Sequence, residues 1–308
     1  MLELGLSKSN RDSIISSQNA LEKSRNIISI DDIIIKDYVE DFFFYCSVDL
    51  RKTNPNYKIY SGLFCNKYIS MYLLNICRIL GTSKETEYTV LELIDRLIFY
   101  QTFNNNEENI LKNKNNLSKI IDFRKQLSSS ILVRIISVIQ IATKLNFRHK
   151  VLKVKDAQRF LRKHNMELSF SEIIGSELIA LEILQNDLNC HSLLDVITLV
   201  WTFVNLKMDI SCKILPNIIS DLIDLFYFFK YQLISDFKIV LRRQKLKESC
   251  DNYLVYASSV IITALVLDKS PIYSQEFINQ FICVVMKTLE IDRFILFSFC
   301  KLLLDIID

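Results

Sequence analysis

Residues 131–145, ILVRIISVIQIATKL, indicate the fold class of this chain. The stretch is apolar nearly all round a helix, interrupted by Arg134, Ser137 and Gln140. A helix that is apolar on every side is typically enclosed by other helices. A second such segment, residues 253–267 (YLVYASSVIITALVL), also contains alanine and is also followed by amphipathic segments. The two segments predict an all-α protein with two helical lobes, each built around one buried central helix.

The composition supports a helical protein with large cores. The chain has 308 residues, half of them hydrophobic, which is enough for one large or two medium domains. Only 4 Gly and 3 Pro are present, which argues against a β-sandwich and against a glycine-rich phosphate-binding loop. A net charge of +3 is too small to indicate nucleic acid or an anionic membrane as the primary partner.

Neither the cysteines nor the apolar segments indicate a secreted or membrane protein. None of the eight cysteines lies within four residues of another, so we expect reduced thiols in an intracellular protein and no zinc site. Residues 1–19 lack the pattern of a secretory signal. Residues 253–267 number 15, short of the ~18–20 that a bilayer requires. We therefore predict a buried core helix there.

Periodicity and capping residues predict the order of the helices. Gly81 is expected to end one helix, Ser83 to begin the next, and Ser171 to cap a third whose apolar face holds Ile174, Leu178, Leu181 and Leu184. A polar surface loop is expected at 104–118. The predicted helices are 30–50, 68–80, 83–99, 131–145, 154–164, 172–184, 192–204, 216–231, 234–249, 253–267, 274–289 and 292–307. The predicted domains are a flexible leader, 1–29, an N-terminal domain, 30–190, and a C-terminal domain, 191–308.

Three segments resemble the cyclin box. Residues 139–145 (IQIATKL) resemble the end of its third helix, which is Ala-Ser-Lys plus a hydrophobe. Residues 176–188 (SELIALEILQNDL) resemble its fifth helix with the Asp-Leu exit, and residues 93–98 (LIDRLI) resemble the Leu-Asp-Arg-Phe end of its second. Their order and spacing agree with the family. The resemblance to cyclins is strong over 64–206, weaker over 207–308, and implies the two-lobed cyclin fold.

Within the cyclins, residues 145–151 (LNFRHKV) resemble the cyclin-like meiotic crossover factors. That resemblance implies a non-enzymatic adaptor in the nucleus, on meiotic chromosomes, which promotes maturation of crossover-designated recombination sites. The implied partners are a cyclin-dependent kinase and recombination or clamp-loader proteins. We expect no cofactor, no metal, no small-molecule substrate, no membrane association and no sequence-specific binding of nucleic acid.

The resemblance also assigns roles to particular residues. Lys144 and Glu177 match the pair that projects from the lobe of a cyclin and binds the backbone beside a helix of the kinase. Asp95 matches a buried structural aspartate, but its usual arginine partner is replaced by Asn66, so it needs another partner or access to water. Ala142 is expected where helices approach closely. The substrate-docking set is altered and consists of Cys65, Ile69 and Tyr72.

Several alternatives remain open at this point. Lys144 and Glu177 also suit an ordinary surface ion pair. A basic segment is interpreted as a solvated helix face, with contact to phosphates or an acidic partner as the alternative; its residues are Arg148, His149, Lys150, Lys153, Lys155, Arg159, Arg162 and Lys163. The three histidines lack catalytic spacing, so no catalytic residue is assigned. The rival function is that of a general cyclin, which activates a cyclin-dependent kinase in cell-cycle or transcription control. A third alternative, a helical-repeat interaction protein, is disfavoured because the sequence shows no repeat with a period of 30–50 residues.

Overall fold

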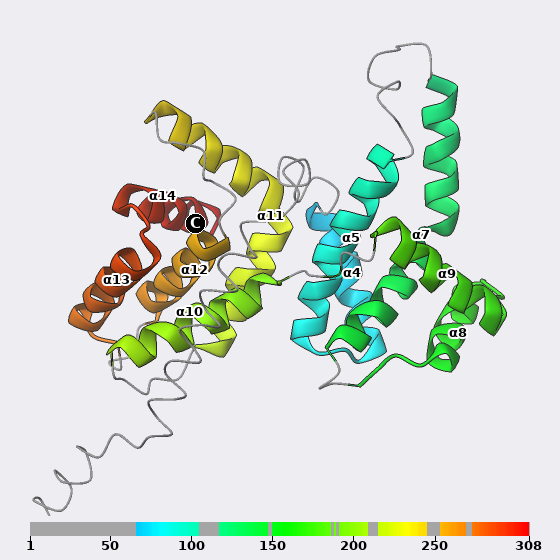
Figure 1. Ribbon diagram of the computed structural model, residues 1–308, viewed down its shortest axis with the longest axis horizontal. Helices are drawn as coiled ribbons and strands as arrows, with labels where there is room; N and C mark the ends of the chain where they lie inside the picture. Colours follow the sequence, from blue (N-terminus) through cyan, green and yellow to red (C-terminus); the bar gives the residue numbers. More distant parts are fainter. Residues whose placement is uncertain are drawn as a thin grey trace, which may run out of the picture. The chain divides into compact units, whose positions relative to one another are not determined.

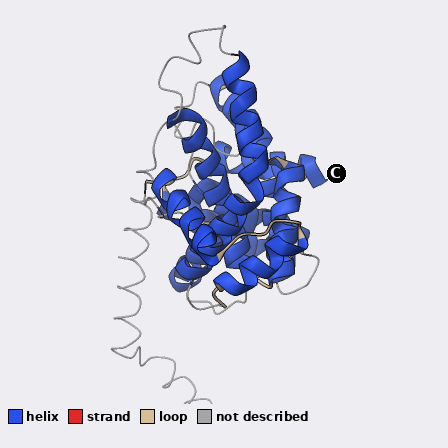
Figure 2. Cartoon of the chain, turned by 90° about the vertical axis from the view of Figure 1, so that its right-hand side faces the viewer, coloured by secondary structure: helices blue, strands red, loops and turns tan. Residues whose placement is uncertain are grey.

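The structure of this protein is a computed structural model, and it describes residues 66–104, 117–146, 150–185, 188, 191–208, 215–244, 253–268 and 273–307. These residues form helices and short connections without a strand (Figures 1 and 2). The all-α prediction is therefore confirmed for the described residues. The predicted leader and the predicted helix at 30–50 lie outside them. The described helices are α4 (Lys67–Leu80), α5 (Lys84–Asn104), α7 (Leu117–Leu145), α8 (Val154–Lys163), α9 (Phe170–Ile183), α10 (Leu193–Met208), α11 (Pro216–Arg243), α12 (Tyr253–Leu267), α13 (Gln275–Leu289) and α14 (Arg293–Ile307).

Two helices are buried as the sequence predicted. Residues 135–143 of α7 are all buried, and α7 packs against α5, α8 and α9. Residues 254–265 of α12 are all buried, and α12 packs against α10, α11, α13 and α14. Contacts of α4 and α5 with α11 and α10 join these two sets of helices within one compact unit, Val48–Asp308. The division into domains at residue 190 stays a prediction.

Local capping explains where α4 begins and ends. The side chain of Asn66 accepts hydrogen bonds from the backbone amides of Tyr68 and Ile69, at 3.1 and 3.2 Å. At the other end Gly81 has φ +70°, a conformation in which a side chain would be strained. The prediction that Gly81 ends this helix is confirmed.

The N-cap of α9 is Ser169, so the prediction of Ser171 is wrong. Ser169 Oγ accepts from the backbone amide of Glu172, and the Glu172 carboxylate accepts from the amide of Ser169. This reciprocal pair is a capping box, whose signal is Ser followed three residues later by Glu. Ser171 has Ile174 at that distance and lies inside the first turn.

Three other boundaries differ from the prediction. Helix α11 consists of two helical segments that meet at a kink at Phe229 (φ −117°, ψ 15°). The predicted pair 216–231 and 234–249 is therefore present, with its junction slightly earlier and its second member ending at Arg243. Helix α5 continues to Asn104, and α7 begins at Leu117 rather than at residue 131. Residues 104, 117 and 118, which were predicted to belong to the polar loop, are therefore helical. The polar residues at the end of α5 and the start of α7 do not end these helices, because most polar side chains lower helix propensity only slightly.

Candidate partner-binding site

Lys144 and Glu177 form a salt bridge between α7 and α9. Lys144 lies in the last turn of α7, where the helix dipole favours a cation, and its side chain is 52% exposed. Glu177 lies on the side of α9 that packs against α7, and its side chain is only 9% exposed. The expectation that both groups face outward is therefore correct for Lys144 and wrong for Glu177. The pair offers a partner one exposed ammonium group held in place by a buried carboxylate.

Polar contacts beside this pair hold α9 in register on α7. Ser137 Oγ lies 2.8 Å from Ser176 Oγ, and both side chains are buried. The Arg134 guanidinium donates to the carbonyl oxygen of Ser176 at 3.4 Å. Burial lowers the pKa of Arg134. Since Ser176 precedes Glu177, these contacts position the carboxylate that Lys144 binds.

The outward face of α9 is apolar, contrary to prediction. Of the four residues predicted for the apolar face of this helix, Leu184 is buried and Leu181 is half-buried, but Ile174 and Leu178 are exposed, and Leu178 has 61% of its surface accessible. The buried face instead consists of Ile173, Ser176, Glu177 and Ala180. Because this buried face includes the polar residues Ser176 and Glu177, apolar spacing in the sequence could not identify the side of α9 that packs against α7.

Exposed apolar side chains lie close in sequence to both members of the Lys144–Glu177 pair. Leu145 follows it directly and is exposed, while Ile174 and Leu178 lie within one turn of Glu177 on α9. Large apolar side chains left exposed beside a charge are typical of protein-binding surfaces, where the apolar part supplies area and the charge supplies orientation. Lys144, Leu145, Ile174 and Leu178 are hereafter called the α7–α9 face.

The two predicted structural residues are both buried. Asp95 on α5 is 1% exposed, which excludes the alternative that it stays near water. Asn66, which replaces the expected arginine, has its side-chain oxygen bound to the first amides of α4. Ala142 is completely buried in the enclosed part of α7.

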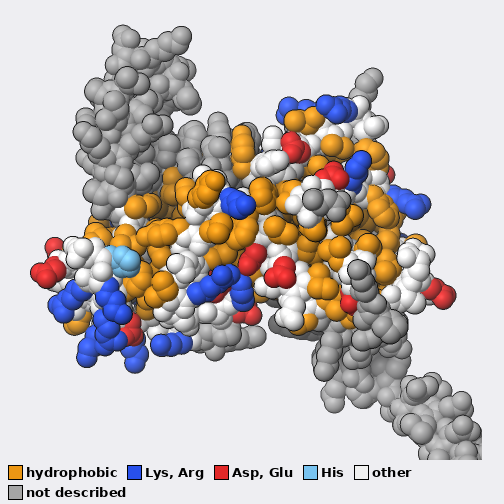
Figure 3. Space-filling view, turned by 180° about the vertical axis from the view of Figure 1, so that it is seen from behind, with side chains coloured by type: hydrophobic (Ala, Val, Ile, Leu, Met, Phe, Trp, Pro, Cys, Tyr) orange, Lys and Arg blue, Asp and Glu red, His pale blue; other side chains and the backbone are white. Residues whose placement is uncertain are grey.

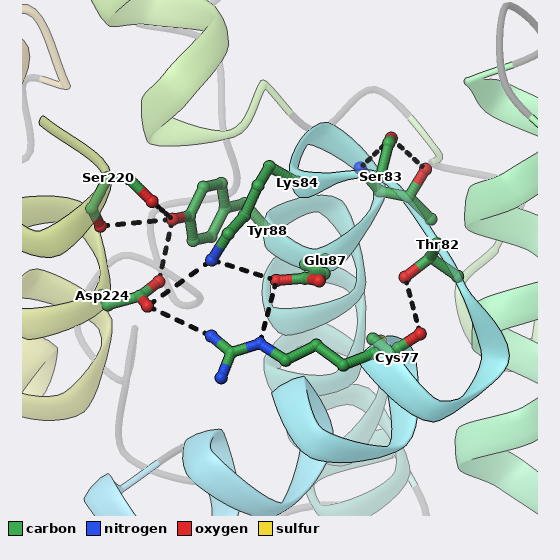
Figure 4. Close-up of polar contacts among 10 residues, drawn as sticks. Cys77, Thr82, Ser83, Lys84, Glu87, Tyr88, Ser220 and Asp224 are labelled. Carbon is green, nitrogen blue, oxygen red and sulfur yellow. Dashed lines mark hydrogen bonds and ion pairs between the residues drawn. The ribbon is translucent and has the colours of Figure 1, made fainter. Parts of the chain in front are cut away.

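A network of charged groups joins α4, α5 and α11 (Figure 4). Tyr88 Oη donates to Asp224 at 2.8 Å, and Asp224 also binds Arg78 at 3.3 Å and Lys84 at 3.5 Å. Lys84 lies 3.3 Å from Glu87, whose pKa burial raises despite that cation. Every acid in this network faces a cation already present, which identifies it as a link between helices.

A second charged group, which was not predicted from the sequence, is buried between α5, α11 and α12. Lys230 of α11 binds both carboxylate oxygens of Glu92 of α5 at 2.9 Å, and Tyr253 Oη donates to Glu92 at 2.6 Å. The sequence does contain a pattern that indicates burial of Lys230. This lysine lies three residues from Tyr227 and three from Leu233, both on the buried face of α11. A lone cation on an apolar helix face requires an acidic partner.

The described residues contain no obvious site for a metal. No group of three His, Cys, Asp or Glu among them could hold an ion. His164, one of the three histidines of the chain, lies beside the Phe160 ring, with centroids 4.6 Å apart. Within the same described part, no helix is both long and apolar enough to cross a bilayer.

Comparison with known proteins found no match to a family model, to a curated protein or to a solved structure.

Proposed function

We propose that this chain is a cyclin-like, non-enzymatic adaptor that binds a cyclin-dependent kinase through the α7–α9 face. The observation that carries the proposal is the Lys144–Glu177 salt bridge together with the exposed Ile174 and Leu178, which lie within one turn of Glu177 on α9. A helix of a partner could lay apolar side chains on Ile174 and Leu178, while a backbone carbonyl at its end accepts from the Lys144 ammonium. The cyclin fold is part of this proposal.

The proposed biological role is in meiotic crossover formation. It rests on the resemblance of residues 139–151 and 176–188 to cyclin N-terminal domain-containing protein 1, within the cyclin-like meiotic crossover factors. In this role the chain acts in the nucleus on meiotic chromosomes, recruiting the kinase to recombination or clamp-loader proteins at crossover-designated sites. The competing role, activation of a kinase in cell-cycle or transcription control, has no separate structural support and is an outcome of the test.

The test is affinity purification from meiotic tissue with charge variants of the pair. Lys144→Glu removes the proposed contact and should abolish recovery of the kinase. The combined variant Lys144→Glu with Glu177→Lys restores an internal ion pair but reverses the exposed charge. We expect this variant to melt like the wild type and still to recover no kinase. Recovery of the kinase by the combined variant would overturn the proposal, since the pair would then be structural.

Lys287→Glu is the matched control, because Lys287 is an exposed lysine on α13. It changes the net charge as Lys144→Glu does and should leave kinase recovery unchanged. Loss of crossovers in a Lys144→Glu strain with unchanged kinase activity supports the adaptor role. Loss of kinase activity in non-meiotic cells supports the competing activator instead.

A further inference from the structure

The positive charge of this chain is concentrated on and just before α8. Residues 150–163 contain six basic side chains and one carboxylate, a net charge of +5, whereas the whole chain has +3. The rest of the chain therefore has a small negative net charge. Figure 3 shows Lys and Arg side chains gathered at the lower left of the face in view, the region that α8 occupies. The six basic residues are Lys150, Lys153, Lys155, Arg159, Arg162 and Lys163, and all are exposed.

Four of these cations line a single hollow on the surface. The hollow has a volume of about 370 Å³, and its described lining consists of Lys155, Gln158, Arg159, Arg162 and Lys163. Arg159 lies 3.3 Å from Asp156. Among the described residues, no ion pair is found for the other three cations. The cations therefore repel one another with little internal compensation.

Helix energetics explain only part of this arrangement. Ala157, Phe160 and Leu161 anchor the opposite side of α8 in the core, so the basic side must face outward. Arg162 and Lys163 lie in the last turn, where the helix dipole favours cations. Lys155 lies in the first turn, where the dipole disfavours a cation. A negatively charged ligand that contacts all the cations of the hollow explains why a cation is present at Lys155 as well.

We infer that this basic face of α8 binds the phosphodiester backbone of duplex nucleic acid, without reading its sequence. Lys155, Arg159 and Lys163 follow one another at four-residue intervals, a row about 12 Å long. A duplex presents one charge per ~1.7 Å of its axis, so about seven phosphate charges lie along that row. Several outward cations therefore meet several phosphates at once.

The same residues argue against the other anionic partners. Phe160, the only aromatic residue in 150–163, is buried, so the basic stretch itself presents no exposed ring on which single-stranded bases could stack. The described lining of the hollow contains no hydroxyl group and no apolar side chain that would bind a phosphopeptide beside its phosphate. The amide of Gln158 donates to the carbonyl oxygen of Leu168 at 2.8 Å, which ties it to the protein.

The experiment measures binding of the full chain to a fluorescent 25-base-pair DNA duplex of mixed sequence by anisotropy. With about four phosphate contacts, the affinity should fall about 100-fold between 50 and 200 mM salt. Arg162→Glu with Lys163→Glu should weaken binding more than tenfold at 50 mM salt and reduce the salt slope by about two. A second duplex of unrelated sequence should bind equally well.

The matched control is Lys287→Glu with Lys301→Glu, which makes the same change in net charge at exposed positions on α13 and α14. It should retain the affinity of the wild type, and circular dichroism should show that both variants are folded. Absence of binding at 50 mM salt, equal loss in the control, or tighter binding of a doubly phosphorylated peptide than of the duplex would overturn the inference. Kinase recovery depends on Lys144, so it tests the proposed function separately.

Discussion

Lys230 and Glu92 form a buried salt bridge that joins α11 to α5, although 138 residues separate them in the chain. Their side chains are 2% and 3% exposed. The Lys230 ammonium also lies 5.6 Å from the centroids of the Tyr227 and Tyr253 rings. It directly follows Phe229, where α11 is kinked. The salt bridge thus connects the two sets of helices at the point where α11 changes direction.

Lys230→Met should lower the free energy of unfolding by about 3–5 kcal/mol, because it leaves the Glu92 carboxylate buried without its cation. Urea denaturation followed by circular dichroism measures this loss. The control is Lys230→Met with Glu92→Met, which removes both charges and should recover much of the stability. A single variant as stable as the wild type would show that the pair is not buried as described.

The stability cost of Lys230→Met should shrink as the pH falls from 7 to 4. Burial alone would raise the pKa of Glu92, but Lys230 and Tyr253 bring it below its ordinary value. In the wild type, the ionised Glu92 carboxylate therefore stabilises the folded state. This contribution is complete above the pKa that Glu92 has in the unfolded chain, and it is lost as the pH falls through the lower pKa of the folded state. In the variant, burial without the cation raises that pKa, so protonation stabilises the fold. A cost independent of pH would contradict this ionic pairing.

Ser169→Ala should destabilise the protein by about 1 kcal/mol, since Ser169 caps α9. Ser171→Ala is the matched control, and we expect it to change stability by less than about 0.5 kcal/mol. The Ser171 hydroxyl lies 2.9 Å from Ser169 Oγ, within the first turn. Thermal melts of the two variants side by side distinguish the caps. A larger loss for Ser171→Ala would restore the original prediction.

Ala142→Arg should prevent folding of the helices around α7, because Ala142 is completely buried and a guanidinium group has no space or partner there. Loss of cooperative melting, measured by circular dichroism, is the expected result. The control is Lys144→Arg, two residues further along α7, which keeps the charge at an exposed position. Near-unchanged melting of Ala142→Arg would refute the burial of this part of α7.

Features that depend on neighbouring residues could be predicted from the sequence. The limits of α12, residues 253–267, were predicted in full, and Gly81 was placed at the end of α4. Ser169 was missed although its capping box is visible in the sequence, because a serine two residues later was chosen instead. Lys144, Glu177, Asp95 and Ala142 were singled out by resemblance. Asp95 and Ala142 are both buried, whereas the roles of Lys144 and Glu177 in binding stay predictions.

Features that depend on residues distant in the chain required the tertiary structure. In α9, Ile173 and Ile174 are identical neighbours in the sequence, but packing against α7 buries Ile173 together with the polar Ser176 and Glu177, whereas Ile174 stays exposed. The partner of Lys230 likewise lies far away in the chain, on α5. Helix formation follows from local hydrogen bonds and hydrophobic spacing, whereas burial and charge pairing depend on which helices meet, because only packing removes a side chain from water.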